Sequence, residues 1–543
     1  MPDARPQGNV GVVSRWQRYW FADGGRFAAA VVRIAIAAAV LMTLGRLMTL
    51  TTLVAPVPLY RPVGVWMVLG RTPPPGMLVD VLWICAWVGT VAMLVGWRTR
   101  TATIVSFIAA SSIAALSFSG SATWSHQYNV VLIAQAAFLG ARGGDVLSID
   151  ALLRSRRGLP PLDVPGGYQW SLRLVQLSVA LMFAGAFFHK IASGHGTLRW
   201  ALSDNLRHHL LVRFDLADLP RPAMVDWIID DVWRYRSAAL LNLAGQVVPF
   251  LACIFVRRPW LRAACGLAFI VETLALGFVI GLWNPQWLPL AAVFIDWDRL
   301  ILYLARRPVT APREPGPRHR AIPIFVAAFL AYTLATAFVP TLDQRLNTYP
   351  FSGFPMFSTI RAARPYDQHL PYRIAGDHIE VLGNTVHVFA QRWLDHTPRG
   401  LYRLKDPNKV RAKLAAILAD APQRYPDATM RGLRHYLTVF EAPAYPARAR
   451  FDRHLLAITG EITPEGTFRS VLGTWHGSLV ELGAIGIDIT NATLEIYRDN
   501  DVVPLAVTAV RRGAQFELPP LEGDVLYAVA VIDGVRWLVA TRD

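Results

Sequence analysis

The chain has 543 residues, of which 53% are hydrophobic and only 17% are charged, and its formal net charge is +16. This composition is typical of a membrane protein rather than a soluble domain. All three cysteines lie in apolar runs, which does not indicate a disulfide framework. The positive charge does not indicate nucleic-acid binding, because no such motif occurs and membrane orientation and anionic lipid headgroups explain arginine-rich loops.

A polar N-terminal segment precedes the apolar part. Residues 1–26 are basic and lack the apolar core and cleavage site of a signal peptide, so we expect them to remain as a cytoplasmic, interfacial segment. Residues 27–341 then contain apolar runs of about the length that crosses a bilayer. The pattern predicts nine spans, of which the fourth and eighth are short: 27–45, 78–97, 101–119, 126–140, 169–190, 237–256, 259–281, 284–297 and 321–340.

The arginines predict the orientation of these spans. The connections at 97–100 and 141–167 and the cluster at 306–320 are rich in arginine and lie on one side of the predicted bundle, although arginines at 191–236 argue weakly against it. Arginine-rich short loops usually face the cytoplasm. We therefore expect a multi-pass protein of the inner (plasma) membrane with a cytoplasmic N-terminus and everything after Pro340 outside.

The last 200 residues change character. Residues 342–543 contain no run long enough to span, and alternating stretches surround Gly383-Asn384 and Asp533-Gly534, a pattern typical of β-hairpins. Two stretches, 408–420 and 428–440, look helical. We therefore predict a multi-pass α-helical membrane domain followed by an extracytoplasmic, β-rich α+β domain. The aromatic segment 347–358 is expected to lie on the membrane surface or over the site.

One lysine stands apart from the other basic residues. Only four of the 54 basic residues are lysines, and Lys190, at the end of the predicted span 169–190, is the only one before Lys405. Arginine stays protonated in almost any surroundings, whereas a desolvated lysine can lose its proton and act as a base. Lys190 is therefore a candidate base, although a lysine near a helix end also often extends to the membrane interface.

Three stretches carry a family resemblance. FAGAFFHKIASGHGTLRWALSDNLRHHL (Phe183–Leu210), FAAAVVRI (Phe27–Ile34) and WSHQY (Trp124–Tyr128) resemble, in this order, segments of the HTTM family, whose membrane domain is similar to vitamin K-dependent gamma-carboxylase. The similarity fades after the membrane part.

The resemblance implies a quinol-dependent carboxylase or epoxidase of the carbon-carbon lyase class. In it, Lys190 would deprotonate a reduced quinone and His126 would be the hydrogen-bonding partner, with O2 and CO2 as further reactants. Because the arginine-rich composition suggests a bacterial host, menaquinol would replace vitamin K hydroquinone. The implied partner is a glutamate-containing protein or peptide, in addition to the lipid bilayer.

The predicted topology places His126 and Lys190 at the same membrane depth. Helical turns back from Lys190 lead to Phe187, Phe183 and Gln176, a stripe that could line a quinone slot or could be ordinary helix packing. The histidines beside the site show no zinc-type spacing, so we expect no metal.

Two alternatives to the carboxylase-like function stay open. One is a non-catalytic membrane anchor or scaffold for the outer domain, and the other is a quinone-linked oxidoreductase. Other polar residues at membrane depth include Arg33, Gln135, Gln246 and Glu272, and Arg33 with Glu272 is a plausible buried ion pair.

Overall fold

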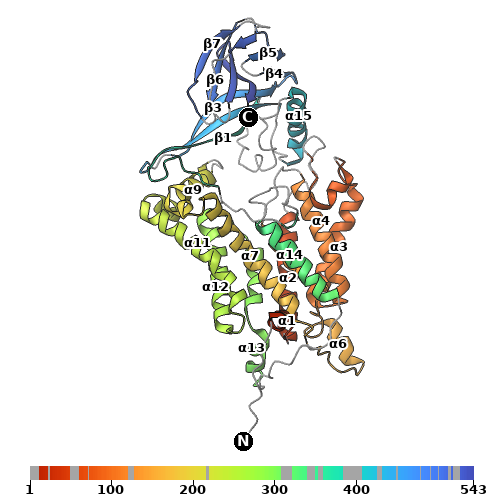
Figure 1. Ribbon diagram of the computed structural model, residues 1–543. Helices are drawn as coiled ribbons and strands as arrows, with labels where there is room; N and C mark the ends of the chain where they lie inside the picture. Colours follow the sequence, from red (N-terminus) through yellow and green to blue (C-terminus); the bar gives the residue numbers. More distant parts are fainter. Residues whose placement is uncertain are drawn as a thin grey trace.

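The computed structural model has a bundle of helices with a β-rich region at one end (Figure 1). It describes residues 12–22, 25–48, 60, 62–70, 72–119, 127–164, 166–215, 219–306, 321–338, 349–351, 359–382, 406–424, 431–447, 450–476, 479–489, 491–498, 501–510, 515–517 and 526–542. All structural statements below refer to these residues.

The bundle consists of α-helices and two 3-10 helices. Within the described ranges, six helices are long and apolar enough to cross a membrane: α2, α3, α4, α7, α11 and α12. In chain order the elements of the bundle are α1 (Val12–Phe21), α2 (Arg26–Met48), η1 (Gly64–Leu69), α3 (Gly76–Val95), α4 (Thr99–Phe118), α5 (Asn129–Ala137), α6 (Ile149–Arg156), α7 (Gln169–Ser193), α8 (Arg199–Leu202), α9 (Asn205–Asp215), α10 (Ala223–Ile229), α11 (Val232–Ile254), α12 (Pro259–Ile280), η2 (Pro285–Phe294), α13 (Trp297–Leu304) and α14 (Ala321–Phe338).

The 3-10 helix η2 runs antiparallel to α2. Near the end of α2, Arg46 Nη1 donates to Gln286 Oε1 (3.1 Å) at the start of η2. Near the start of α2, the backbone N–H groups of Phe27 and Ala28 donate to the carboxylate of Asp298 in α13 (3.1 and 2.9 Å). A 3-10 helix rises about 2.0 Å per residue against 1.5 Å for an α-helix, so the short η2 covers much of the length of α2.

The short helix α5 lies inside the bundle, and all of its residues are buried. Before α5, the carbonyl of Gln127 accepts a hydrogen bond from Trp287 Nε1 (2.7 Å) in η2. After it, the carbonyl of Gly143 accepts from Arg33 Nη1 (2.8 Å) in α2. The sequence predicts spans at 126–140 and 284–297, but the structure forms short elements there, α5 and η2, that pack within the bundle.

Asp298 caps α2 from 270 residues away, and this contact carries a prediction. Asp298→Ala removes the acceptor of two N–H groups in the first turn, and we expect it to lower the free energy of unfolding by about 1–2 kcal/mol. Gly25→Ala should have a similar effect, because a Cβ there would lie 1.5 Å from Asp298 Oδ2. Thermal unfolding in detergent measures both. Asp80→Ala, on the exposed part of α3, is the matched control, and a wild-type transition for Asp298→Ala would contradict the capping role.

The C-terminal region is built on a 10-stranded sheet with the order β7-β6-β9-β10-β3-β4-β5-β8, and β2 joins β1 to β3. Helix α15 (Pro407–Arg424) packs on it, with Val410, Leu414 and Ile417 buried against the sheet. The strands are β1 (Tyr372–Leu382), β2 (Gly432–Ala442), β3 (Asp452–Ile462), β4 (Phe468–His476), β5 (Leu479–Ile485), β6 (Ala492–Arg498), β7 (Ala506–Val510), β8 (Gln515–Glu517), β9 (Leu526–Ile532) and β10 (Val535–Arg542).

Several predictions for this region can be compared with the structure. The hairpin at Asp533-Gly534 joins β9 to β10, and both turn residues have positive φ (50° and 76°), as a type I′ turn requires. The helix predicted at 408–420 is α15, but the helix predicted at 428–440 is wrong, because its described part from Gly432 on forms β2 between β1 and β3. The second half of the hairpin predicted at Gly383-Asn384 lies outside the described residues.

Candidate functional site

Lys190 lies inside the bundle, where α7 meets the middle of α11. Its side chain is only 2% exposed. The amine donates to Asn242 Oδ1 (2.5 Å) and Gln246 Oε1 (3.2 Å), which are one turn apart on α11. The explanation of Lys190 as a side chain that extends to the membrane interface is therefore wrong, because its amine points into the protein and both of its bonds are to protein amides.

A carboxylate completes this polar cluster. Glu272 of α12 is buried and accepts hydrogen bonds from Asn242 Nδ2 and, at 3.5 Å, from Gln246 Nε2. The two amides thus join the amine of Lys190 to the carboxyl group of Glu272. A Cβ at position 245 would lie 2.8 Å from Glu272 Oε2, so Gly245 lets α12 bring this carboxylate against α11. We call Lys190, Asn242, Gln246 and Glu272 the Lys190 cluster.

Arg33 does not pair with Glu272, and that prediction is wrong. The guanidinium of Arg33 donates to the carbonyls of Gly143 (2.8 Å), Leu147 (2.6 Å) and Leu94 (3.4 Å). These three carbonyls belong to loop residues and the end of α3. Arg33 therefore holds one end of the bundle together, and Glu272 faces Lys190 instead.

Aromatic rings cover the Lys190 cluster. The amine of Lys190 lies 4.1 Å from the ring centroid of Trp200 in α8, a cation-π distance. The Trp200 ring is in turn 6.2 Å from the ring of His209 in α9. His209 Nε2 donates to the carbonyl of Thr359 (2.9 Å), in the segment that leads to the C-terminal region. The cover of the site therefore connects Lys190 to the part of the chain that follows the membrane helices.

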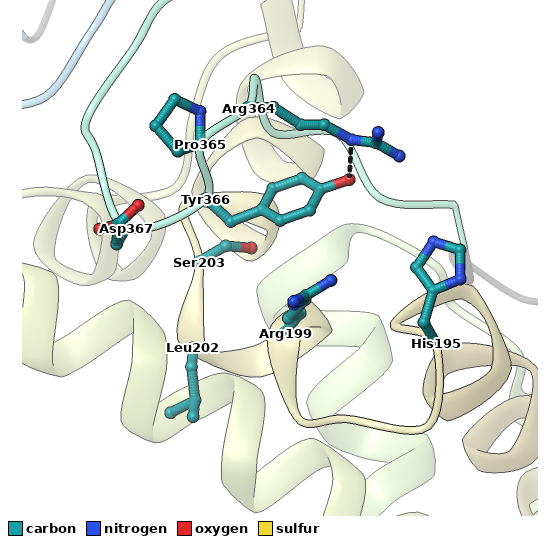
Figure 2. Close-up of a pocket in the computed structure, with 8 residues that line it drawn as sticks. All are labelled: His195, Arg199, Leu202, Ser203, Arg364, Pro365, Tyr366 and Asp367. Carbon is teal, nitrogen blue, oxygen red and sulfur yellow. Dashed lines mark hydrogen bonds between the residues drawn. The ribbon is translucent and has the colours of Figure 1, made fainter.

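A cavity of about 760 Å³ lies on the other side of α8. Figure 2 shows His195, Arg199 and Arg364 around the ring of Tyr366. Arg364 Nε donates to the Tyr366 hydroxyl (3.1 Å), and Arg199 lies 5.8 Å from the centroid of that ring. Two guanidinium groups and an imidazole, against the one carboxylate of Asp367, suit an anionic group such as a carboxylate. Because α8 contributes Arg199 to this cavity and Trp200 to Lys190, a single helical turn separates the two.

The remaining predicted site residues lie at different places. Phe183 packs against Phe269 and Trp287, with ring centroids 5.3 and 6.1 Å away, and is fully buried. Phe187 packs partly buried against the same hydrophobic core. Gln176 accepts a hydrogen bond from Arg173 (2.7 Å), almost four turns of α7 from Lys190. His126 lies outside the described residues.

The C-terminal region is attached to α9 by buried polar contacts. Arg207 donates to the carbonyls of Pro443 and Ala447 (2.7 Å each), in the loop after β2. Asp215, at the end of α9, accepts from the backbone N–H of Phe451 (3.0 Å) while it pairs with Arg221 (2.6 Å). Asn205 accepts from the N–H of Arg361 (2.5 Å). α9 therefore contacts two separate segments, one at Thr359 and Arg361 and the other at Pro443, Ala447 and Phe451.

His208 predicts a pH dependence of this attachment. His208 donates to the carbonyl of Arg361 (2.5 Å) and stacks on Tyr372, and burial lowers its pKa to about 4. An exposed histidine has a pKa of about 6.5. Between pH 6.5 and 4, His208 is therefore protonated in the detached state but neutral in the attached state. We expect the contribution of His208 to the free energy of attachment to fall by on the order of 3 kcal/mol as the pH drops from about 6.5 to 4, and to level off below.

Hydrogen exchange of residues 359–382, measured against pH, checks this expectation. His208→Asn should weaken the pH dependence but not abolish it, because buried His209, which bonds to Thr359 and whose pKa is also lowered by burial, still titrates. His195→Asn removes an exposed histidine and is the control. The same pH curve for wild type and His208→Asn would contradict the assignment to His208.

The structure adds residues that the sequence reasoning missed. Asn242 and Trp200 come to Lys190 from two other helices, α11 and α8. One signal was present: Asn242 and Gln246 stand four residues apart in a predicted span, on one helix face. No protein-family model matches this chain, and no curated protein and no solved structure matches it.

Proposed function

We propose that this chain is a membrane enzyme in which Lys190 acts as a base on a reduced quinone taken from the bilayer. The observation that carries the proposal is the Lys190 cluster, an amine buried beside Trp200 and joined by two amides to a buried carboxyl group. A buried ion pair loses much of its advantage over a neutral pair, since both charges give up their hydration. Glu272 is therefore a suitable place for the proton that Lys190 has to give up before it can act as a base.

The residues around Lys190 fit a quinol in two respects. The Trp200 ring over the amine offers an aromatic face for a planar ring. The amine itself can take the proton of an acidic hydroxyl, and Asn242 and Gln246 hold it in position for this transfer. Lys190 Nζ then carries the proton as an ammonium group opposite Glu272. Of the proposed quinone-slot residues, Phe183 and Phe187 would form an apolar floor, and Gln176 is too far along α7 to take part.

The proposal includes a carboxylation that follows the proton transfer, with O2 and CO2 as co-reactants and menaquinol or vitamin K hydroquinone as the quinol. The cavity beside α8 supports an acidic partner, such as a glutamate-containing protein or peptide, because Arg199 and Arg364 face it. His126 remains proposed as the hydrogen-bonding partner of the quinol.

The proposal also includes nine passes through the inner membrane, with α5 and η2 as the short ones and the C-terminal region outside the cytoplasm. Two observations support it: α5 and η2 both run along α2 inside the bundle, and α1 and the C-terminal region lie at opposite ends of the bundle. Buried short elements satisfy their polar groups within the protein, as a crossing segment has to.

Turnover of purified protein in nanodiscs tests the function. We expect reduced menaquinone or vitamin K, with O2 and labelled bicarbonate, to yield quinone epoxide, and label to enter an added glutamate-containing peptide. Epoxide without label would support the quinol chemistry and contradict the carboxylation. No epoxide from folded protein with either quinol would contradict the proposal.

A second candidate function is a membrane scaffold that holds the C-terminal region. The contacts of Arg207 and Asp215 favour it, because buried polar bonds fix that region on α9. In a scaffold, Lys190 would only stabilise helix packing, and a folded Lys190 variant would keep full function. The oxidoreductase alternative has no observation of its own in its favour.

A further inference from the structure

Helix α6 lies at the end of the bundle away from the C-terminal region (Figure 1), and a second cavity lies beside it. It has a volume of about 760 Å³ and lies between the α3–α4 turn, the loop after α5, and α6. Five arginines line it, and we call it the arginine cavity: Arg98, Arg100, Arg142, Arg154 and Arg157.

The carboxylates that line the arginine cavity already have partners. Asp145 accepts from Arg142 Nε and from the Tyr168 hydroxyl (2.8 Å each). Asp150 caps α4 by accepting from the backbone N–H groups of Arg98 (2.8 Å) and Thr99 (2.9 Å). With five guanidinium groups against two carboxylates, the lining keeps three excess positive charges. An anionic ligand would balance them.

The walls of the arginine cavity are held in place independently of any ligand. Arg33 ties the loop at Gly143 and Leu147 to α2. Gly96, in the α3–α4 turn, has a φ of +71°, and a Cβ there would lie 2.4 Å from Arg33 Nη1. The N–H of Asp150 also donates to the carbonyl of Gly96 (3.0 Å). The arginines therefore project from backbone segments that these hydrogen bonds hold in place.

Exposed apolar side chains border the arginine cavity. Trp97 is 48% exposed and Leu159 is 45% exposed, and both line it, while Leu152 on the outer face of α6 is 52% exposed. Tryptophan beside arginines at the end of membrane helices is typical of the headgroup level of a bilayer. A soluble phosphate compound would gain nothing from these apolar groups, whereas a lipid would place its acyl chains on them.

We propose that the arginine cavity binds the phosphodiester headgroup of an anionic phospholipid. Arg100 and Arg157 supply free charge, because within the described residues neither forms an ion pair with a carboxylate. The ligand's phosphate sits among the guanidinium groups, and its acyl chains run along Trp97 and Leu159 into the bilayer. The site is separate from the Lys190 cluster and does not depend on the proposed chemistry.

Native mass spectrometry of the full-length protein in detergent, titrated with phosphatidylglycerol or phosphatidylcholine, tests this proposal. We expect wild type to retain phosphatidylglycerol in preference to phosphatidylcholine. Arg100→Gln with Arg157→Gln should weaken phosphatidylglycerol binding by about 10- to 30-fold, since each arginine near a lipid surface contributes about a factor of five. Arg156→Gln with Arg257→Gln removes the same charge outside the cavity and should change binding by less than about twofold.

Two results would overturn the proposal. One is equal loss of phosphatidylglycerol in both double variants, which would mean attraction by general charge. The other is displacement of the lipid by millimolar inorganic phosphate or glycerol phosphate, which would assign the arginine cavity to a soluble phosphate compound. A thermal unfolding transition for Arg100→Gln with Arg157→Gln within a few degrees of wild type confirms that the fold around the arginine cavity is intact.

Discussion

Lys190→Met should lower quinol-dependent turnover by at least ~10³-fold, because the variant keeps an unbranched side chain, one atom shorter, but has no amine to act as the base. The amine of Lys190 bonds to Asn242 and Gln246 and faces Trp200, and the other titratable group of the Lys190 cluster is the Glu272 carboxyl group, so a double variant with Glu272→Gln is needed to exclude that group as the base. Epoxide formation in nanodiscs measures the loss. Lys190→Arg should be equally inactive, since arginine stays protonated.

The Lys190 variants need a control for folding. Lys190→Met leaves the amide oxygens of Asn242 and Gln246 without the amine that donates to them, and each unpaired buried acceptor costs about 1–3 kcal/mol. Lys190→Met with Glu272→Gln removes both titratable groups, so that no lone carboxylate stays buried, and should restore part of the stability while it stays inactive. Glu272→Gln alone removes the carboxyl group but keeps the amine of Lys190. Wild-type turnover in the folded double variant would contradict the role of Lys190 as the base.

Arg207→Met should detach the C-terminal region from α9. The variant loses two hydrogen bonds of a buried guanidinium group, to the carbonyls of Pro443 and Ala447, and leaves both acceptors unpaired. Hydrogen bonds to charged groups contribute about 1.5–3 kcal/mol each, so we expect the attachment to weaken by about 3 kcal/mol or more. The signal is a gain of roughly 100-fold in hydrogen exchange at residues 443–451.

Arg234→Met is the matched control for Arg207→Met. Arg234 belongs to α11 and donates to the carbonyl of Trp227, within the helical part. It should leave exchange at 443–451 unchanged. If Arg207→Met also left exchange there unchanged, the attachment would depend on other contacts, such as Asp215 with Phe451.

Local pattern predicted much of the architecture. The long apolar helices and the Asp533-Gly534 hairpin follow from hydrophobic runs and turn residues. The strand β2 does not, because it is buried on both faces and lacks the alternation of a strand that has one face in solvent. Its place between β1 and β3 is set by partners that come from distant parts of the chain.

The candidate site was predictable only in part. Lys190 stands out because arginine fills almost every other basic position of the membrane part. Its neighbours depend on how α11 and α12 are rotated about their axes, which short apolar patterns do not determine. The sequence suggested Arg33 as the partner of Glu272. In the structure Arg33 bonds to backbone carbonyls instead, and Glu272 is joined to Lys190 through Asn242. Trp200 reaches Lys190 because the chain turns back after α7, and spacing alone does not indicate this turn.

The most direct test of the central claim is the absorbance spectrum of a reduced quinone bound to the protein without oxygen. Deprotonated hydroquinone absorbs at longer wavelength than the neutral form, so the spectrum reports the proton transfer itself. We predict up to one equivalent of the deprotonated form per wild-type protein at neutral pH and none with folded Lys190→Met plus Glu272→Gln. Only neutral hydroquinone on wild type, or the same deprotonated signal in the variant, would contradict the assignment of Lys190 as the base.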